Sequence, residues 1–269
     1  MISIITAIYK SERYLAGYLR EARKFADFLM QKSFSFEIII VPTNPSQKEQ
    51  DLLQTVVNES WCVIHPFSRL GIFGAWNEGF GLAKGEVLGP WNVDDIRFPE
   101  AVIEAHTFAQ AGAEIIYFPF LLKRFLNLGP LALPVLTRKV EGEVLEFEKR
   151  KFQINMICGP HFMFTKKAFE KVGPFDEQFK IAGDFDWCAR AAAKGLKFVC
   201  GKNYSGIFRV DGYGISTGRN RRLQAENNII FTRQKAFEKV KSGLEDLVKD
   251  YQVNKILYHG NLLNFPDLL

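Results

Sequence analysis

The sequence predicts an α/β protein with a doubly wound, mostly parallel central sheet flanked by helices. From residue 3 to residue 120, strand-like apolar segments alternate with amphipathic helical segments, which is typical of such a sheet. Residues 36–41 form an almost unbroken apolar run, as expected for a strand that a parallel sheet buries on both faces. With 269 residues, the chain is long enough to bury a substantial core.

Local signals support the individual elements in order. The first strand, residues 3–8, is followed by Ser11 as the N-cap of a helix with apolar residues at helical spacing. Ser46 and Glu49 form a capping box at the start of a second helix. Pro99 occupies the first position of another helix. Further strands are expected at 61–64, 86–91, 114–120, 162–164 and 196–200, and further helices at 71–84, 99–111, 166–172 and 184–194.

Two regions depart from this alternation. Between residues 121 and 157, Gly129-Pro130 and Pro134 indicate loops and residues 139–144 could form a hairpin, so we interpret this stretch as an irregular insertion. Residues 219–269 are expected to form a mostly helical extension. We therefore predict one domain over residues 1–218, divided into the halves 1–112 and 113–218.

The composition favours anionic partners but not nucleic acid. A net charge of +5 and 25 Phe residues indicate an apolar, mildly basic surface, but this charge is too small to indicate nucleic-acid binding by itself. Strand-like residues begin at Ile2, which leaves no room for a signal peptide, and charged residues interrupt the best membrane candidate, 121–135. We therefore expect a cytoplasmic protein. The cysteines form no C-x-x-C pair and are expected to be reduced core thiols: Cys62, Cys158, Cys188 and Cys200.

Adjacent carboxylates follow the apolar strand that ends at Trp91. Asp94 and Asp95 would lie at the mouth of the sheet, where open α/β folds bind ligands. Oxygen ligands suit a hard divalent cation, and such a cation suits a phosphate. The alternative is that the pair caps the next helix. No G-x-G-x-x-G follows the first strand and no G-x-x-x-x-G-K-[ST] is present, which argues against a Rossmann dehydrogenase.

The order of four segments resembles the family 2 glycosyltransferases of the GT-A fold. Residues 3–15 are similar to the opening strand and helix of that family, and residues 74–86 to the helix that precedes its metal-binding strand. Asn92-Val93-Asp94-Asp95 falls where the family carries its D-x-D motif. Residues 169–190, which include Gly183-Asp184-Phe185-Asp186, are similar to the segment that supplies the catalytic base. The resemblance spans about residues 1–220.

The resemblance implies a metal-dependent, inverting transfer of a sugar from a nucleotide-diphosphate donor to a hydroxyl of a saccharide or lipid-linked acceptor. Such enzymes often build surface polysaccharide. The first half, 1–112, would bind the nucleotide, and the second, 113–218, the acceptor. Asp184 would be the general base, unless it only caps its helix, and Asp186 would have a structural or acceptor-orienting role. The donor would contact Thr6, Ala7, Tyr9, Thr43, Asn77, Asn92 and Asp94. A Mn²⁺ or Mg²⁺ ion would bind Asp94, Asp95 and Asp211, with Asp95 either a direct ligand or a residue that supports Asp94 from behind.

Several residues depart from the family pattern. Thr43 stands near the place of an acidic residue that reads the base, Trp76 replaces an arginine, and Asn92 replaces the first Asp of the metal motif. These changes leave open a donor other than a uridine diphosphate sugar, or a catalytically silent binding module. Asp211 could also simply initiate a turn. A basic patch could grip phosphate or be a solvated face: Arg219, Arg221 and Arg222.

A second alternative belongs to a different class of protein. The segment from Tyr117 to Arg138 is apolar and basic, which is typical of a segment that makes peripheral contact with a membrane. Such contact is also compatible with an enzyme that acts on a lipid-linked acceptor.

Overall fold

The structure, a computed structural model, describes residues 1–68, 71–128, 131–140, 148–215 and 220–268. A seven-stranded sheet forms its centre, in the order β10-β6-β9-β4-β1-β2-β3. Every neighbouring pair is parallel except those of β9, which confirms the predicted mostly parallel sheet. The strands are β1 (Ile2–Ile8), β2 (Phe36–Pro42), β3 (Cys62–Ile64), β4 (Val87–Pro90), β6 (Ile115–Tyr117), β9 (Met163–Thr165) and β10 (Phe198–Cys200).

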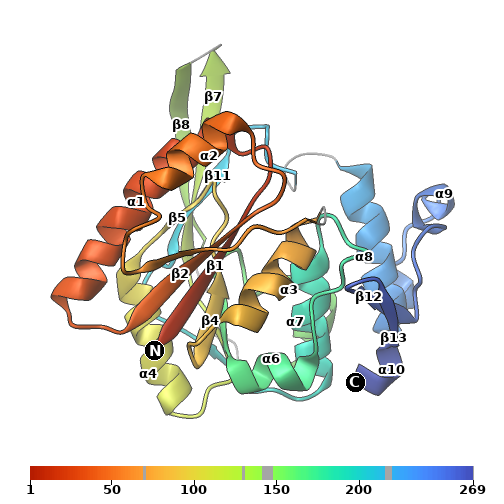
Figure 1. Cartoon of the computed structure of the whole chain (residues 1–269). Coiled ribbons are helices and arrows are strands. Elements are labelled where there is room, and N and C mark those ends of the chain that lie inside the picture. Colours follow the sequence, from red (N-terminus) through yellow and green to blue (C-terminus); the bar gives the residue numbers. More distant parts are fainter. Residues whose placement is uncertain (69–70, 129–130, 141–147, 216–219, 269) are drawn as a thin grey trace.

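Helices cover both faces of this sheet (Figure 1). Alternate residues of β1 enter two separate cores: Ile4 packs in the core of α1 and α4, and Ile5 in the core of α3, α6 and α7. Gly79 of α3 allows close approach to β1, because a Cβ there would lie 2.6 Å from a methyl group of Ile5. The helices are α1 (Glu12–Gln31), α2 (Gln47–Gln54), α3 (Ile72–Leu82), α4 (Pro99–Gln110), α6 (Lys166–Val172) and α7 (Gly183–Ala193).

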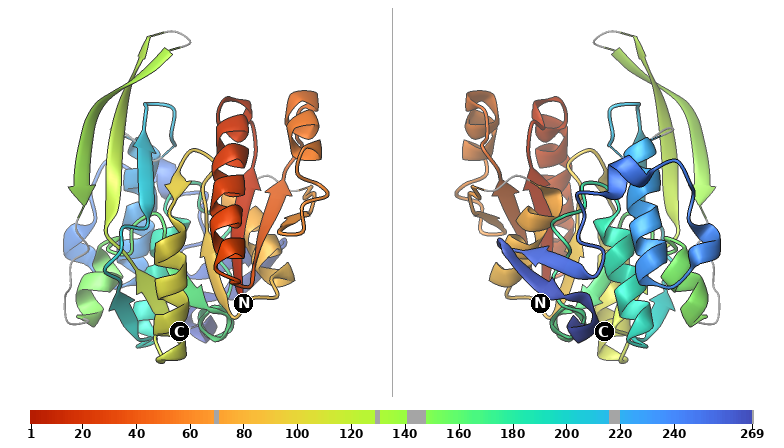
Figure 2. Two further views of the ribbon diagram at one scale, coloured as in Figure 1. Left: turned by 90° about the vertical axis from the view of Figure 1, so that its left-hand side faces the viewer. Right: turned by 90° about the vertical axis from the view of Figure 1, so that its right-hand side faces the viewer.

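We expected an irregular insertion at 121–157, but much of this region forms two strands of a second, four-stranded sheet. Its order is β5-β11-β7-β8, and its strands are β5 (Ile96–Arg97), β11 (Gly206–Val210), β7 (Phe120–Leu128) and β8 (Leu131–Val140). The antiparallel β7–β8 hairpin projects beyond the body of the molecule (Figures 1 and 2). Helix α5 (Lys149–Ile154) follows.

Pro134 lies inside β8 and not in a loop, which corrects the sequence interpretation. The strand tolerates this proline because β8 pairs only with β7 among the described strands and the register shifts opposite, between Arg124 and Phe125. The hairpin predicted at 139–144 is also wrong in its first part, since Lys139 and Val140 end β8. The rest of that prediction, 141–144, lies outside the described residues.

The C-terminal extension is less helical than expected. It contains α8 (Arg221–Arg233), the short helices η1 (Phe237–Lys239), α9 (Glu245–Val248) and α10 (Phe265–Leu268), and a hairpin of β12 (Lys255–Tyr258) and β13 (Asn261–Asn264). His259 and Gly260, between these strands, both have positive φ, as a tight hairpin turn requires. In the part of the chain that is described, no helix combines the length and apolar character needed to cross a membrane.

Candidate active site

A cavity of about 1180 Å³ opens at the carboxyl ends of β1, β2 and β4. This volume exceeds that of a typical small-ligand pocket, so the cavity can hold two substrates together. One wall comes from the first hundred residues and the other from α7, α8 and the second sheet. The lining includes Ala7, Tyr9, Tyr14, Thr43, Asn92 and Asp94 on one side and Met156, Asp184, Phe185, Phe208, Arg209 and Phe231 on the other.

Asp94 lies in the turn after β4 and lines the cavity. Burial, followed by the nearby negative charge of Asp211, raises the pKa of Asp94 above its ordinary value. The two carboxylates repel each other. A cation bound at Asp94, in the cavity, would relieve this repulsion.

Asp95, by contrast, does not line the cavity, which disagrees with a direct contact with metal but not with a supporting place behind Asp94. Its side chain is buried, and one carboxylate oxygen accepts a hydrogen bond of 2.9 Å from the backbone N–H of Arg209. The other oxygen lies 3.7 Å from Nε2 of His161. Burial, and then the adjacent Asp94, raise the pKa of Asp95 well above its usual range. Asp95 therefore ties the turn after β4 to β11.

The carboxylate of Asp211 also accepts hydrogen bonds from other side chains of the protein. Its Oδ2 atom accepts hydrogen bonds from the hydroxyl of Tyr14 and from Nε of Arg209, both at 2.8 Å. Although burial opposes it, these bonds lower the pKa of Asp211 below the ordinary value. Asp211 does not line the cavity, but its charge acts on Asp94, and its partner Arg209 lines the cavity.

A divalent cation fits this arrangement if the donor supplies further ligands. Within the described ranges, no group of three or more His, Cys, Asp or Glu side chains is placed to hold a metal ion. Asp94 offers a hard carboxylate oxygen to the cavity, and Mg²⁺ is commonly held by one or two carboxylates together with substrate phosphates. Asp94 is therefore the residue that would hold the cation.

The predicted donor contacts divide into two groups. Ala7, Tyr9, Thr43 and Asn92 line the cavity, whereas Thr6 and Asn77 do not. The hydroxyl of Thr6 is buried and lies 2.7 Å from that of Tyr18 of α1. The side-chain amide of Asn77 is also buried, and exchanges hydrogen bonds of 2.8 Å with the backbone N–H and C=O of Phe175.

These contacts correct the predictions for Thr6 and Asn77. Side chains alternate along β1, so that Ala7 reaches the cavity and Thr6 points toward α1. Asn77 fixes the loop that precedes α7, because its amide nitrogen donates to Phe175 and Glu177 and its amide oxygen accepts from Phe175.

Asp184 lies in the first turn of α7 and lines the same cavity as Asp94. The N-cap of this helix is Ala182, so the alternative interpretation of Asp184 as the cap does not hold. Burial, with a smaller contribution from the Glu226 carboxylate, raises the pKa of Asp184 to about 6. A carboxylate with this pKa is ionised at neutral pH but is a stronger base than an exposed aspartate.

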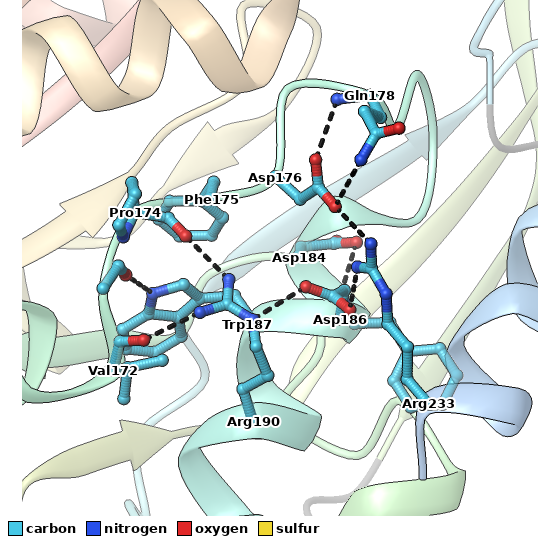
Figure 3. A network of polar contacts seen from close by, with 12 residues as sticks. Val172, Pro174, Phe175, Asp176, Gln178, Asp184, Asp186, Trp187, Arg190 and Arg233 are labelled. Carbon is cyan, nitrogen blue, oxygen red and sulfur yellow. Dashed lines mark hydrogen bonds and ion pairs between the residues drawn. The ribbon is translucent and has the colours of Figure 1, made fainter. Parts of the chain in front are cut away.

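A buried network of ion pairs fixes the orientation of α7 (Figure 3). Asp186 accepts hydrogen bonds from Nε of Arg190 at 2.9 Å and from Nη1 of Arg233 at 2.8 Å. Arg233 of α8 also donates to Asp176, 2.7 Å away. Although burial opposes it, the two arginines lower the pKa of Asp186 below its usual value. Asp186 is thus a structural residue.

Glu226 of α8 holds the loop directly before Asp184. Its fully buried carboxylate accepts hydrogen bonds from the backbone N–H groups of Lys180 and Ile181 at 2.9 Å and of Ala182 at 2.8 Å. The hydroxyl of Tyr251 donates a further bond of 2.7 Å. A lone glutamate in a C-terminal helix has no sequence signal for this role, and sequence reasoning missed it.

The structure explains one departure from the family pattern, Trp76, and places two residues of the predicted basic patch, Arg221 and Arg222. Trp76 is buried and forms edge-to-face contacts with Phe73 and Phe175, both with centroids 5.4 Å apart. It therefore packs in the core and also forms part of the cavity wall. Arg221 and Arg222 donate to the Gly243 carbonyl and the Tyr251 hydroxyl and do not line the cavity. Arg219 lies outside the described residues.

Comparison with solved structures finds the same fold in known glycosyltransferases. S. aureus TarS 1–349 in complex with UDP has a TM-score of 0.61 and 14% sequence identity, over 85% of this chain and 63% of that one. The complex of TarS 1–349 with UDP-GlcNAc gives 0.60 and 12%, over 93% and 73%. Mannosyltransferase PcManGT from Pyrobaculum calidifontis, in complex with GDP-Man and Mn²⁺, gives 0.57 and 11%, over 93% and 67%.

These identities establish similarity of fold, and the chain spans less than two thirds of the length of TarS 1–349 in the first of these matches. The comparison with curated proteins found no match. The model of the family described as glycosyl transferase family 2 matches residues 3–173, which includes Asp94 and ends before Asp184. Because this match covers more than half of the chain and the fold agrees, the protein belongs to glycosyl transferase family 2 and has a GT-A fold.

Proposed function

We propose that this protein moves a sugar from a nucleotide-diphosphate donor to an acceptor hydroxyl, with inversion and with the help of a divalent cation. The observation that carries the proposal is that Asp94 and Asp184, far apart in the sequence, line one cavity. The cavity also lies at the carboxyl ends of parallel strands, where α/β proteins bind nucleotides.

The donor would occupy the wall formed by the first hundred residues. Ala7, Tyr9, Thr43 and Asn92 would contact the nucleotide, and Asp94 would hold the cation against the diphosphate. When bound, the cation supplies positive charge that makes the nucleoside diphosphate a better leaving group. Arg209 lines the same region and would add positive charge near the leaving phosphate.

Asp184 would act as the general base on the opposite wall. Its carboxylate would accept the proton of the acceptor hydroxyl while that oxygen forms a bond to the anomeric carbon. The bond between the anomeric carbon and the diphosphate oxygen breaks in the same step, and its electron pair leaves with the nucleoside diphosphate. A single displacement of this kind inverts the anomeric configuration.

The acceptor side of the cavity is rich in apolar side chains, which supports an acceptor with an apolar part. Its lining includes Ile154, Met156, Phe185, Phe208, Leu223 and Phe231. A free saccharide would leave these side chains without apolar partners, whereas a lipid-linked acceptor would cover them. We therefore propose a lipid-linked acceptor in preference to a free saccharide.

Donor hydrolysis in the presence of Mn²⁺ tests this function without knowledge of the acceptor, because water can replace it. Wild-type protein is expected to release nucleoside diphosphate from UDP- or GDP-sugars when Mn²⁺ is added. Asp94→Asn is expected to lose the dependence on Mn²⁺ together with activity, and Asp184→Asn to lose turnover but keep nucleotide binding. Asp246→Asn, at an exposed position, is the matched control.

A catalytically silent nucleotide-sugar module is the second candidate. The substitution of Asn92 in the metal motif and the burial of Asp95 favour it, because both reduce the number of carboxylates in the cavity. This candidate predicts nucleotide binding by the wild type without turnover of donor under any acceptor. Turnover that disappears in Asp184→Asn would exclude it.

A further inference from the structure

Exposed apolar side chains lie along the projecting β7–β8 hairpin. Leu126, Leu133, Val135 and Leu136 each expose about half of their surface, between 48% and 58%. Leu126 pairs with Leu133, and Arg124 pairs with Leu136. Because directly paired residues of antiparallel strands share one face, three leucines lie on the same side of the hairpin.

This leucine face continues the apolar wall of the cavity. Phe120 of β7 and Phe208 of β11 line the cavity, and their rings are in edge-to-face contact with centroids 6.2 Å apart. Side chains alternate along β7, so Leu122, Arg124 and Leu126 follow Phe120 on this face. Arg209, which also lines the cavity, lies on the opposite face of β7, and its guanidinium stacks on the ring of Phe125 at 4.0 Å.

Positive charge flanks the exposed leucines. Residues 120–140 contain Lys123, Arg124, Arg138 and Lys139 and no acidic residue. Arg124, Arg138 and Lys139 are exposed. An apolar face edged by cations matches the surface of a bilayer with anionic headgroups, where leucines enter the acyl boundary and cations meet phosphate.

We propose that the β7–β8 hairpin docks the protein on an anionic lipid surface, with its leucine face and the mouth of the cavity toward the bilayer. The hairpin is the segment that extends farthest from the body, so it can reach a flat surface (Figures 1 and 2). The proposal goes beyond sugar transfer and does not depend on it, because binding to lipid requires neither donor nor catalysis.

A second copy of the chain fits this surface less well. The β8 edge carries Pro134 and a register shift, and both features oppose the addition of another strand. Two such hairpins would also bring like charges together, since each carries four cations.

Co-sedimentation with vesicles tests the proposal. The wild type is expected to bind vesicles of phosphatidylcholine with about one third phosphatidylglycerol, more weakly at high salt, and to bind pure phosphatidylcholine poorly. Arg124→Gln with Arg138→Gln should lower the partition coefficient about 25-fold, at roughly fivefold for each cation. Leu126→Asn with Leu133→Asn should lower it about tenfold or more.

Matched controls alter the same residue types elsewhere on the surface. Leu262→Asn changes a leucine that is 48% exposed on β13, and Lys241→Gln with Lys249→Gln removes two exposed cations. These variants should bind the vesicles as the wild type does. Thermal unfolding of every variant at an unchanged temperature would show that the fold is intact, because all the altered side chains are exposed.

Two results would overturn the proposal. One is equal binding of the wild type and both hairpin variants to the anionic vesicles. The other is a dimer in solution that the leucine substitutions dissociate, without any binding of the wild type to lipid. Neither result would bear on donor hydrolysis, so a failure here is distinguishable from a failure of the proposed transferase activity.

Discussion

At the scale of single residues, the placement of each side chain decides its chemistry. Asp94 and Asp95 are neighbours in the sequence, yet the first lines the cavity and the second is buried beneath it. Thr6 and Ala7 differ in the same way. Sequence patterns placed the carboxylates after β4 but did not show which of the two faces the cavity, and on β1 a shift of one position moves a side chain to the other face of the strand.

The elevated pKa of Asp184 predicts a pH dependence of activity. A base must be ionised, so kcat/KM for transfer or donor hydrolysis should rise tenfold per pH unit below about pH 6 and level off above it. Asp184→Asn should lower kcat by roughly 10²- to 10⁴-fold and abolish this rise. A pH–rate profile measures both effects. A wild-type rate that is constant from pH 4.5 to pH 8 would contradict the role of Asp184.

The same pKa predicts a stability effect of opposite sign to the effect on activity. Because the pKa of Asp184 is higher in the folded than in the unfolded chain, its stabilising contribution is complete below about pH 3.8. It is lost as the pH rises through about 6. Asp184→Asn should therefore raise the free energy of unfolding by up to about 3 kcal/mol at pH 8, and by roughly half of that at pH 5. Urea denaturation at the two pH values measures the difference, and a greater gain at pH 5 would contradict it.

At the scale of secondary-structure elements, periodicity and capping signals predicted the central sheet and the helices that cover it. The Ser46–Glu49 capping box is present, and α4 begins at Pro99 as expected. The two hairpins were missed for separate reasons. Pro134 suggested a loop although an edge strand tolerates proline, and the turn at His259-Gly260 lacks the usual Asn-Gly signal.

The contacts of α8 predict a positioning role for Glu226. Glu226→Gln replaces a charged acceptor of three backbone hydrogen bonds with a neutral amide, and should lower stability by about 1–3 kcal/mol. The looser loop would displace Asp184, so kcat should fall while the KM for the donor stays unchanged. Steady-state kinetics measures this split, with Asp246→Asn as an exposed control. A rise in the KM for the donor with an unchanged kcat would contradict the role of Glu226 in positioning the base.

The buried ion pairs of Arg233 predict a larger loss of stability than that expected for Glu226→Gln. Arg233→Met would leave Asp176 and Asp186 buried without this partner, which typically costs about 3–5 kcal/mol. Chemical denaturation measures the change. Lys235→Met, two residues away and exposed, is the matched control and should change stability little. Similar stabilities for the two variants would show that the network contributes little.

At the scale of the whole molecule, the cavity is built from segments along nearly the entire chain. Its lining extends from Ala7 to Lys239, and the C-terminal extension contributes Leu223 and Phe231. Such convergence is a property of the tertiary fold, so the sequence predicted it only through the resemblance of ordered segments to a known family. The C-terminal extension packs in the same core as α7 through Ile229 and Ile230.

Removal of the extension should therefore unfold the protein. A chain that ends at residue 219 would lose the partners of Asp176, Asp186 and the loop at Lys180–Ala182, and it would expose the apolar face of α7. Circular dichroism and size-exclusion chromatography of the truncated chain should show loss of the cooperative thermal transition or aggregation. A monomeric truncated chain with an unchanged melting transition would contradict this packing role.

Anomalous diffraction from crystals grown with Mn²⁺ and the nucleoside diphosphate that binds best tests the central claim most directly. The proposed mechanism predicts a manganese peak beside the carboxylate of Asp94, with the diphosphate on that ion and Asp184 across the same cavity. A nucleotide bound outside this cavity, or a manganese ion whose ligands exclude Asp94, would contradict it.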